Sequence, residues 1–251
     1  MKLLAALIFF TRLPFWRIAN VPPRYYKEVV NYWPLTGWLT GGVMAGVFAA
    51  ASQVTSVPVA LLLALFARVL LTGALHEDGL ADFFDGMGGG TSRERILAIM
   101  KDSHIGTYGV AGLVAYFLLC YALLAGIPRE HVPWVMWGCD AWSKAAAARL
   151  INLLPYARTE AESKAGVVYA RMSRPVVLFT LLCGIVPMLP FLVADAGQCL
   201  VLPVPFIVTW LIARMLRRKI QGYTGDCNGA TFLLAELAMY LSIHIYLHIN
   251  S

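Results

Sequence analysis

Long apolar runs separated by short polar connections dominate the hydropathy pattern of this 251-residue chain. A helix needs roughly 20 mostly apolar residues to cross the hydrocarbon core of a bilayer. Seven runs approach that length, and Pro, Gly or charged residues separate them. They cover residues 35–52, 57–75, 107–127, 132–153, 175–194, 199–216 and 229–249. The pattern predicts an all-α fold, a polytopic membrane helix bundle of about seven transmembrane helices, and one membrane-embedded domain over residues 1–251.

The amino end carries an eighth, shorter apolar run at residues 3–10. It follows Lys2 and so imitates a signal peptide, but Arg12 and Pro14 come directly after it and no small-x-small cleavage site appears. Eight apolar residues are too few to span the bilayer. We therefore expect a retained interfacial or re-entrant helix.

Composition and charge agree with a membrane setting. The chain is 59% hydrophobic and 14% charged, a balance that one soluble core of this size could not hide. The net charge is +6, but the basic residues form no continuous face, so we expect no nucleic-acid partner. If the amino end lies in the cytoplasm, Arg129 is the only Lys or Arg residue in the connections on the outer side. The positive-inside rule therefore predicts that the amino end and the functional loops face the cytoplasm.

One inner connection, residues 76–109, concentrates carboxylates at a membrane boundary. If this stretch is helical, Asp78, Asp82 and Asp85 occupy positions i, i+4 and i+7 on one face, where like charges repel unless a cation lies between them. Charged groups beside the hydrocarbon are costly and often mark functional sites. A solvated acidic helix end is the alternative. Because carboxylate oxygens suit Mg²⁺ or Mn²⁺, we predict a metal site formed by Glu77, Asp78, Asp82 and Asp85.

A glycine run and several basic residues follow the acidic face. Three successive glycines could form a flexible stretch whose backbone N–H groups meet phosphate oxygens. The run lacks the Gly-Lys-Ser/Thr end of a P-loop, so as a motif it is weak. A histidine in this segment could donate to phosphate or be an ordinary interfacial residue. The predicted anion-binding residues here are Gly88, Gly89, Gly90, Arg93, Arg95, Lys101 and His104.

Two other parts of the chain carry polar groups next to apolar runs. The connection before the last span reads GYTGDCNG and supplies Thr224, Asp226 and Asn228 as a second polar half-site. Asp140 and Lys144 lie at i and i+4 within the fourth span, and we favour an intramembrane ion pair over a catalytic role. The five cysteines show no metal or disulfide spacing and are expected to be small buried residues.

Four blocks together, HEDGLADFFDGMGGG, KDSHIGTYG, FFTRLP and GYTGDCNGA, resemble the cobalamin synthase family, also called adenosylcobinamide-GDP ribazoletransferases. The resemblance covers residues 10–236. It implies a catalytic domain in the bacterial cytoplasmic (inner) membrane that transfers the cobinamide-phosphoryl group of adenosylcobinamide-GDP to α-ribazole or its 5′-phosphate, with release of GMP. This reaction is the last assembly stage of the cobalamin nucleotide loop. Besides these substrates and membrane lipid, the resemblance admits a homo-oligomer and soluble nucleotide-loop enzymes as partners.

For this reaction we expect one or two Mg²⁺ ions, replaceable by Mn²⁺, to bridge the diphosphate on the acidic face. Asp82, Asp102 and Asp226 are the catalytic candidates, the last two to orient or deprotonate the ribose hydroxyl. A CDP-alcohol phosphotransferase is a rival, but Asp78-Gly79 is not followed by that family's A-R. A secondary transporter that uses Asp140, Lys144 and Glu236 is a second rival, although no clear inverted repeat is present.

Overall fold

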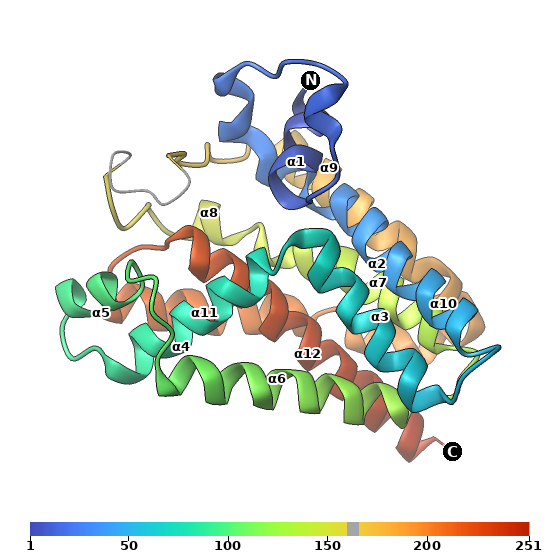
Figure 1. Ribbon diagram of the computed structural model, residues 1–251. Helices are drawn as coiled ribbons and strands as arrows, with labels where there is room; N and C mark the ends of the chain where they lie inside the picture. The colour runs from blue at the N-terminus through green and yellow to red at the C-terminus, as the bar shows by residue number, and fades with distance from the viewer. Residues whose placement is uncertain (160–165, 251) are drawn as a thin grey trace.

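The computed structural model describes residues 1–159 and 166–250, and these form an all-helical bundle (Figure 1). Within them the only sheet-like contact is an isolated bridge between Tyr156 and Tyr223. The predicted all-α class is therefore confirmed. The α-helices are α1 (Lys2–Phe10), α2 (Trp33–Ala51), α3 (Val57–Thr72), α4 (Leu75–Gly89), α5 (Arg93–Ile99), α6 (Thr107–Ala125), α7 (Val132–Ala147), α8 (Leu150–Leu153), α9 (Arg174–Ile185), α10 (Leu189–Ala194), α11 (Val204–Lys219) and α12 (Gly225–Ile249). The 3₁₀ helices are η1 (Phe15–Arg17), η2 (Pro23–Tyr32), η4 (Val186–Met188) and η5 (Ala196–Val201).

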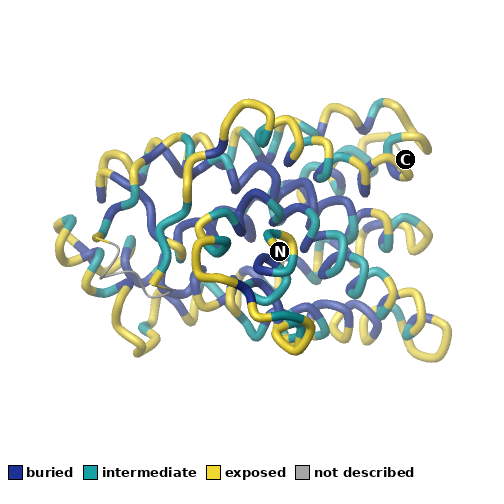
Figure 2. Tube along the Cα trace, turned by 90° about the horizontal axis from the view of Figure 1, so that it is seen from above, coloured by how far each residue is buried: buried dark blue, intermediate teal, exposed yellow. Residues whose placement is uncertain are grey.

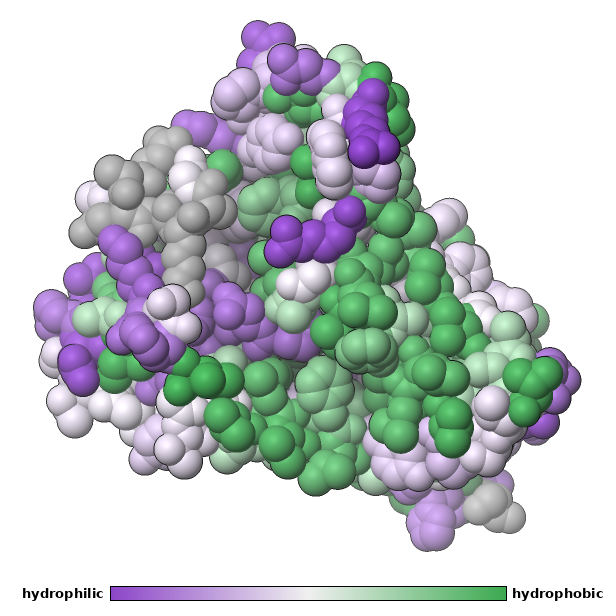
Figure 3. Space-filling view, in the orientation of Figure 1, coloured by the Kyte–Doolittle hydropathy of each residue, from purple (hydrophilic) through white to green (hydrophobic). Residues whose placement is uncertain are grey.

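Five helical stretches among the described residues are long and apolar enough to cross a membrane, or six if the bent pair α3–α4 counts as one span. The five are Pro23–Ala51, Thr107–Ala125, Arg174–Ala194, Ala196–Lys219 and Gly225–Ile249. The predicted span 132–153 is broken, because α7 ends at Ala147 and α8 begins at Leu150. Broad apolar surface covers α3 and α6, as a membrane-embedded fold requires (Figure 3).

Helix α7 lies in the centre of the bundle, and Figure 2 shows this centre as buried chain. Every residue from Gly138 to Ala148 is buried, so this part of the chain is enclosed on all sides. Small residues explain how closely α2 packs on it: a Cβ on Gly37 would lie 2.7 Å from the Ala141 Cα, and one on Gly41 would lie 2.9 Å from the Asp140 Cβ. Gly37 and Gly41 have the small-x-x-x-small spacing that lets two helices approach closely.

Helices α3 and α4 meet at a sharp break of 91°. Gly73 and Ala74 both have positive φ angles, 65° and 58°, and the amide of Arg12 donates to the Leu71 carbonyl at 2.7 Å. The first part of the stretch expected to be an inner connection, residues 76–89, therefore belongs to helix α4, which packs on α6 and α12. Glycine makes this packing close, since a Cβ on Gly79 would meet the Asp226 Cα at 3.1 Å.

The amino-terminal run forms the short helix α1, as predicted. Helix α1 packs against η2 and beside the start of α2, outside the main bundle (Figure 1). Its Phe10 is buried, and its ring stacks on Trp33 with centroids 5.3 Å apart. The amino end therefore forms one wall of the region described next.

Candidate functional site

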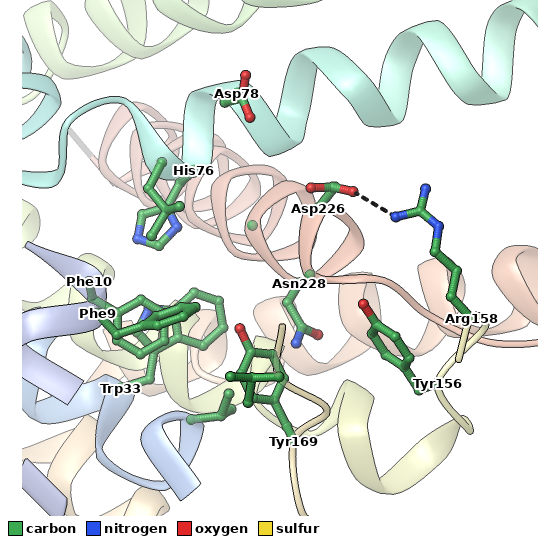
Figure 4. A pocket seen from close by; sticks show the side chains of 15 residues that line it. Phe9, Phe10, Trp33, His76, Asp78, Tyr156, Arg158, Tyr169, Asp226 and Asn228 are labelled. Carbon is green, nitrogen blue, oxygen red and sulfur yellow. Dashed lines mark ion pairs between the residues drawn. The ribbon is translucent and has the colours of Figure 1, made fainter. Parts of the chain in front are cut away.

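A cavity of about 300 Å³ lies where α1, α2, α4 and α12 meet Tyr156, Arg158, Val167 and Tyr169 (Figure 4). Aromatic side chains line one part of it and charged side chains another. The aromatic residues are Phe9, Phe10, Trp33, Tyr156 and Tyr169, and the charged residues are Asp78, Arg158 and Asp226. Sequence segments more than 150 residues apart thus form a single cavity.

The first turns of two long helices meet at this cavity. Leu75, His76 and Asp78 belong to the start of α4, and Asp226 and Asn228 belong to the start of α12. The α3–α4 break places the α4 start here instead of letting the helix continue. Helix N-termini carry partial positive charge and free backbone N–H groups, so they favour anions. Two such termini beside one cavity suit a ligand with phosphate groups.

Polar contacts at the α12 start hold its side chains in place. Thr224 caps the helix by accepting the Cys227 amide at 3.3 Å, and its hydroxyl donates to the Asp226 carboxylate at 3.2 Å. The Arg158 guanidinium lies 4.0 Å from the same carboxylate and donates to the Leu97 carbonyl at 2.8 Å. Figure 4 shows Arg158 extended towards Asp226. The Arg158 guanidinium and the Asp226 carboxylate therefore lie side by side in the lining of the cavity.

Three buried side chains on the cavity wall have polar atoms with no hydrogen-bond partner within residues 1–159 and 166–250: Trp33 Nε1, His76 Nε2, and both amide atoms of Asn228. These residues are 1%, 3% and 4% exposed, respectively. An unpaired buried polar group costs about 1–3 kcal/mol. Such groups are expected where a ligand supplies the missing partners.

The four predicted metal ligands do not converge on one point. Asp78 lines the cavity, whereas Glu77 is buried and lies 4.0 Å from Arg68. The Asp85 carboxylate accepts the amides of Gly106 and Gly109 at 2.7 and 2.8 Å, which caps the start of α6. Asp82 is 9% exposed on the same helix. Within residues 1–159 and 166–250, no three Asp, Glu, His or Cys side chains are grouped as ligands for one ion.

The glycine run differs from the flexible loop that we expected. Gly88 and Gly89 are the last residues of α4, and the Gly90 amide donates to the Gly86 carbonyl at 3.0 Å. A Cβ on Gly88 would lie 2.6 Å from the Tyr108 ring, so glycine here permits close packing. The helical hydrogen bonds occupy the backbone groups that the sequence suggested for phosphate.

The basic residues after α4 lie in several environments. Arg93 donates to the carbonyls of Ile220 and Ala157 at 3.1 and 2.8 Å and so joins two connections. Arg95 lines an exposed cleft of about 480 Å³ beside α6. Lys101 and Arg158 line a neighbouring cleft of about 510 Å³ that also touches Arg93. Arg158 is therefore shared between this basic cleft and the main cavity.

Asp102 and His104 also lie in the cleft beside α6, outside the lining of the main cavity. The His104 ring nitrogen lies 2.7 Å from the Asp102 carboxylate, and the His104 amide donates to it at 3.0 Å. These hydrogen bonds, the one from the side chain first, lower the pKa of Asp102 below its usual value. The structure thus separates Asp102 from Asp226, although both were candidates for one catalytic role.

A buried charge network joins α3, α6, α7 and α12. Arg68 donates to both Glu236 oxygens at 2.6 Å, and the Tyr116 and Tyr240 hydroxyls donate to the same carboxylate at 3.0 Å. Lys144 and Asp140 form the ion pair that their i, i+4 spacing predicted, and both side chains are fully buried. These groups neutralise one another inside the bundle, which favours a structural role.

Several residues of the cavity escaped the sequence prediction: Phe9, Trp33, Tyr156, Arg158 and Tyr169. Phe9 and Phe10 both belong to the motif block FFTRLP, but nothing in the sequence ties this block to the acidic segment. No local spacing connects aromatic residues of α1 and α2 with a loop near residue 158. In contrast, Asp78, Asp226 and Asn228 were predicted as site residues and line the cavity.

Comparison with known proteins agrees with the early resemblance. The family model for cobalamin-5-phosphate synthase matches residues 2–244. The adenosylcobinamide-GDP ribazoletransferase of Shewanella amazonensis is 41% identical over 95% of this chain and 92% of that protein. Proteins of the same name from Leptothrix cholodnii and Vibrio cholerae are 38% and 36% identical, over 94% and 97% of this chain and 92% and 93% of their own lengths. No solved structure matches the chain.

Proposed function

The chain belongs to the cobalamin-5-phosphate synthase family, and on this premise we propose that it is an adenosylcobinamide-GDP ribazoletransferase. It transfers the cobinamide-phosphoryl group of adenosylcobinamide-GDP to a ribose hydroxyl of α-ribazole, or of α-ribazole 5′-phosphate, and releases GMP. The family assignment does not favour a CDP-alcohol phosphotransferase or a secondary transporter.

The observation that carries the proposal is the joining of Asp78, Asp226 and Arg158 at one cavity beside two helix N-termini. Transfer between a diphosphate and a hydroxyl needs groups that neutralise phosphate and a group that accepts a proton. Arg158 and the N-termini of α4 and α12 can neutralise phosphate, and a carboxylate can accept the proton. The apolar bundle around the cavity strengthens these electrostatic effects.

The donor set suits Mg²⁺, which commonly takes one or two carboxylates and completes its shell with substrate phosphates and water. Asp78 would hold the ion, together with Asp82 one turn further along the same face of α4. We assign no ligand role to Asp85 or Glu77, since the first caps α6 and the second faces Arg68. When bound, the ion would neutralise negative charge on the diphosphate and the departing GMP.

The remaining roles belong to the chain's own side chains. Asp226, oriented by Thr224, accepts the proton of the attacking ribose hydroxyl. A new ribose O–P bond forms at the phosphorus that bears the cobinamide group, and the P–O bond to GMP breaks. Arg158 contacts phosphate oxygens and stabilises the charge that GMP carries away. This arrangement requires no covalent enzyme intermediate.

A direct test measures GMP release from adenosylcobinamide-GDP and α-ribazole by the detergent-purified protein with Mg²⁺. The protein should release GMP, and Asp226→Asn and Asp78→Asn should each lower kcat about 10²–10⁴-fold, the usual range for acid–base groups. Asp195→Asn, a carboxylate outside the cavity lining, should retain full activity. Unchanged kcat in Asp226→Asn would refute its role, and full activity in excess EDTA would refute the ion.

We propose further that the cavity faces the cytoplasm of a bacterial cell. The exposed basic residues Arg217, Arg218 and Lys219 end α11, just before the α12 start that lines the cavity. The positive-inside rule assigns this end of the bundle to the cytoplasm. Nucleotide substrates made in the cytoplasm could then reach the cavity without crossing the membrane.

A further inference from the structure

We propose that the aromatic part of the cavity is the subsite for the base of the acceptor nucleoside, the benzimidazole ring of α-ribazole, and not for the guanine of the donor. This inference rests on the proposed function and assigns one of its two substrates to a place. Trp33, His76 and Asn228 supply polar atoms to this subsite, and Phe10 and Tyr169 supply aromatic surface.

The shape of the wall indicates a flat aromatic ligand. Phe10 and Trp33 stack with an interplanar angle of 13°, and the His76 ring lies 5.5 Å from the Trp33 ring, centroid to centroid. Each of the three rings is at most 4% exposed, so the surrounding packing fixes its orientation. Rigid rings of this kind bind planar heterocycles through stacking and edge contacts. Figure 4 shows the Tyr169 ring on the side of the cavity towards which the Asn228 amide points.

Trp33, His76 and Asn228 bring to the wall polar atoms that have no hydrogen-bond partner among the residues that the structure describes. The Trp33 indole can only donate, His76 Nε2 donates or accepts according to its tautomer, and the Asn228 amide can do both. A benzimidazole attached to ribose offers a single ring nitrogen as acceptor and an otherwise apolar edge.

The size of the cavity favours the same assignment. In α-ribazole the base and the attacking hydroxyl are attached to the same ribose. A base bound in an aromatic subsite beside Asp226 therefore places the hydroxyl close to the Asp226 carboxylate. In the activated corrinoid, the guanine is separated from the attacked phosphorus by a second phosphate and a whole ribose. A cavity of about 300 Å³ with acidic and aromatic parts side by side accommodates the compact acceptor. The corrin ring and guanosine then lie outside this subsite.

Equilibrium dialysis of the detergent-purified protein against α-ribazole and, separately, GMP tests the assignment. Trp33→Phe removes one N–H donor and keeps an aromatic ring, and Asn228→Leu replaces an amide by an apolar group of similar size. Each variant should raise the Kd of α-ribazole at least tenfold and leave the Kd of GMP unchanged. In turnover, KM for α-ribazole should rise while KM for the activated corrinoid stays constant.

Trp38→Phe is the matched control, because its indole donates to the Cys183 carbonyl away from the cavity lining. It should leave both Kd values unchanged, and unaltered Tm values would show that the variants are folded. Loss of GMP affinity in place of α-ribazole affinity would overturn the proposal, as would unchanged affinity for both ligands. Asp78→Asn, which should lower kcat about 10²–10⁴-fold, should still bind α-ribazole. Failure of the reaction and failure of the subsite are therefore distinguishable.

Discussion

Glu236 illustrates how single residues stabilise charge inside this bundle. Its carboxylate accepts hydrogen bonds from Arg68 and from two tyrosine hydroxyls, and both Arg68 and Glu236 are nearly inaccessible to solvent. Arg68 also lies 3.5 Å from Asp140, which joins this pair to the Asp140–Lys144 pair. Removing one member would leave an uncompensated charge in an apolar surrounding.

Glu236→Ala should therefore destabilise the protein by about 3–5 kcal/mol, the range measured when one partner of a buried ion pair is deleted. The measurement is thermal unfolding in detergent, where Tm should fall clearly. Asp195→Asn is the control: it removes a surface carboxylate charge but keeps an oxygen for the Gly197 amide and the Tyr246 hydroxyl, so it should change Tm little. A Tm equal to that of the unchanged chain would contradict the structural role given to this network.

The sequence predicted some of these residues and not others, for a physical reason. The Asp140–Lys144 pair follows from helical spacing and was predicted. Arg68 and Glu236 are 168 residues apart, so their pairing depends on tertiary packing that no local pattern encodes. The same reason explains why Asp78 and Asp226 were predicted as candidates while the roles of Trp33 and Arg158 were not.

At the scale of elements, the break between α3 and α4 decides where the acidic residues lie. Two successive residues with positive φ end α3 and start α4 in a new direction. Ala74 takes a conformation that costs an L-residue about 1–2 kcal/mol, and neighbouring packing maintains it. The sequence contains a glycine at position 73, but an apolar run followed by acidic residues is as typical of a span followed by a loop as of two helices joined by a sharp break. Hence the acidic helix was predicted as a connection.

Gly73→Ala should weaken the protein by about 1–2 kcal/mol, because alanine is strained at a φ of 65° and its Cβ would collide with the Arg12 side chain. Thermal unfolding in detergent and KM for both substrates measure the effect. Gly46→Ala is the matched control: it lies within α2 with open space around it, so it should keep or slightly raise Tm. Equal Tm values for the two variants would show that the break tolerates a side chain.

At the scale of the whole molecule, the bundle has two distinct ends. The turn between α2 and α3 lies at the same end as the C-terminus, whereas α5 and the start of α12 lie at the other (Figure 1). The end with α5 carries the basic residues and the clefts described above. This polarity agrees with the asymmetry of basic residues between the two sides that the sequence predicts.

Labelling with a membrane-impermeant maleimide tests the orientation. In a Cys199→Ser background, Gln53→Cys at the α2–α3 turn should react in intact bacterial cells, because we expect this turn to face outwards. Arg218→Cys, at the exposed end of α11, should react only after lysis. The opposite labelling pattern would place the cavity on the outer side and exclude the proposed orientation.

The acidic helix α4 also constrains the order in which the protein can be made. Aspartate at the centre of a membrane segment costs about 2.5–3.5 kcal/mol on insertion scales, and α4 carries three aspartates and a glutamate over 15 residues. As it leaves the translocon it cannot enter lipid alone, and its packing partners α6 and α12 are both synthesised after it. Helix α4 must therefore stay at the bilayer surface until these helices have been made, so the cavity cannot form on a nascent chain that has not yet reached α12.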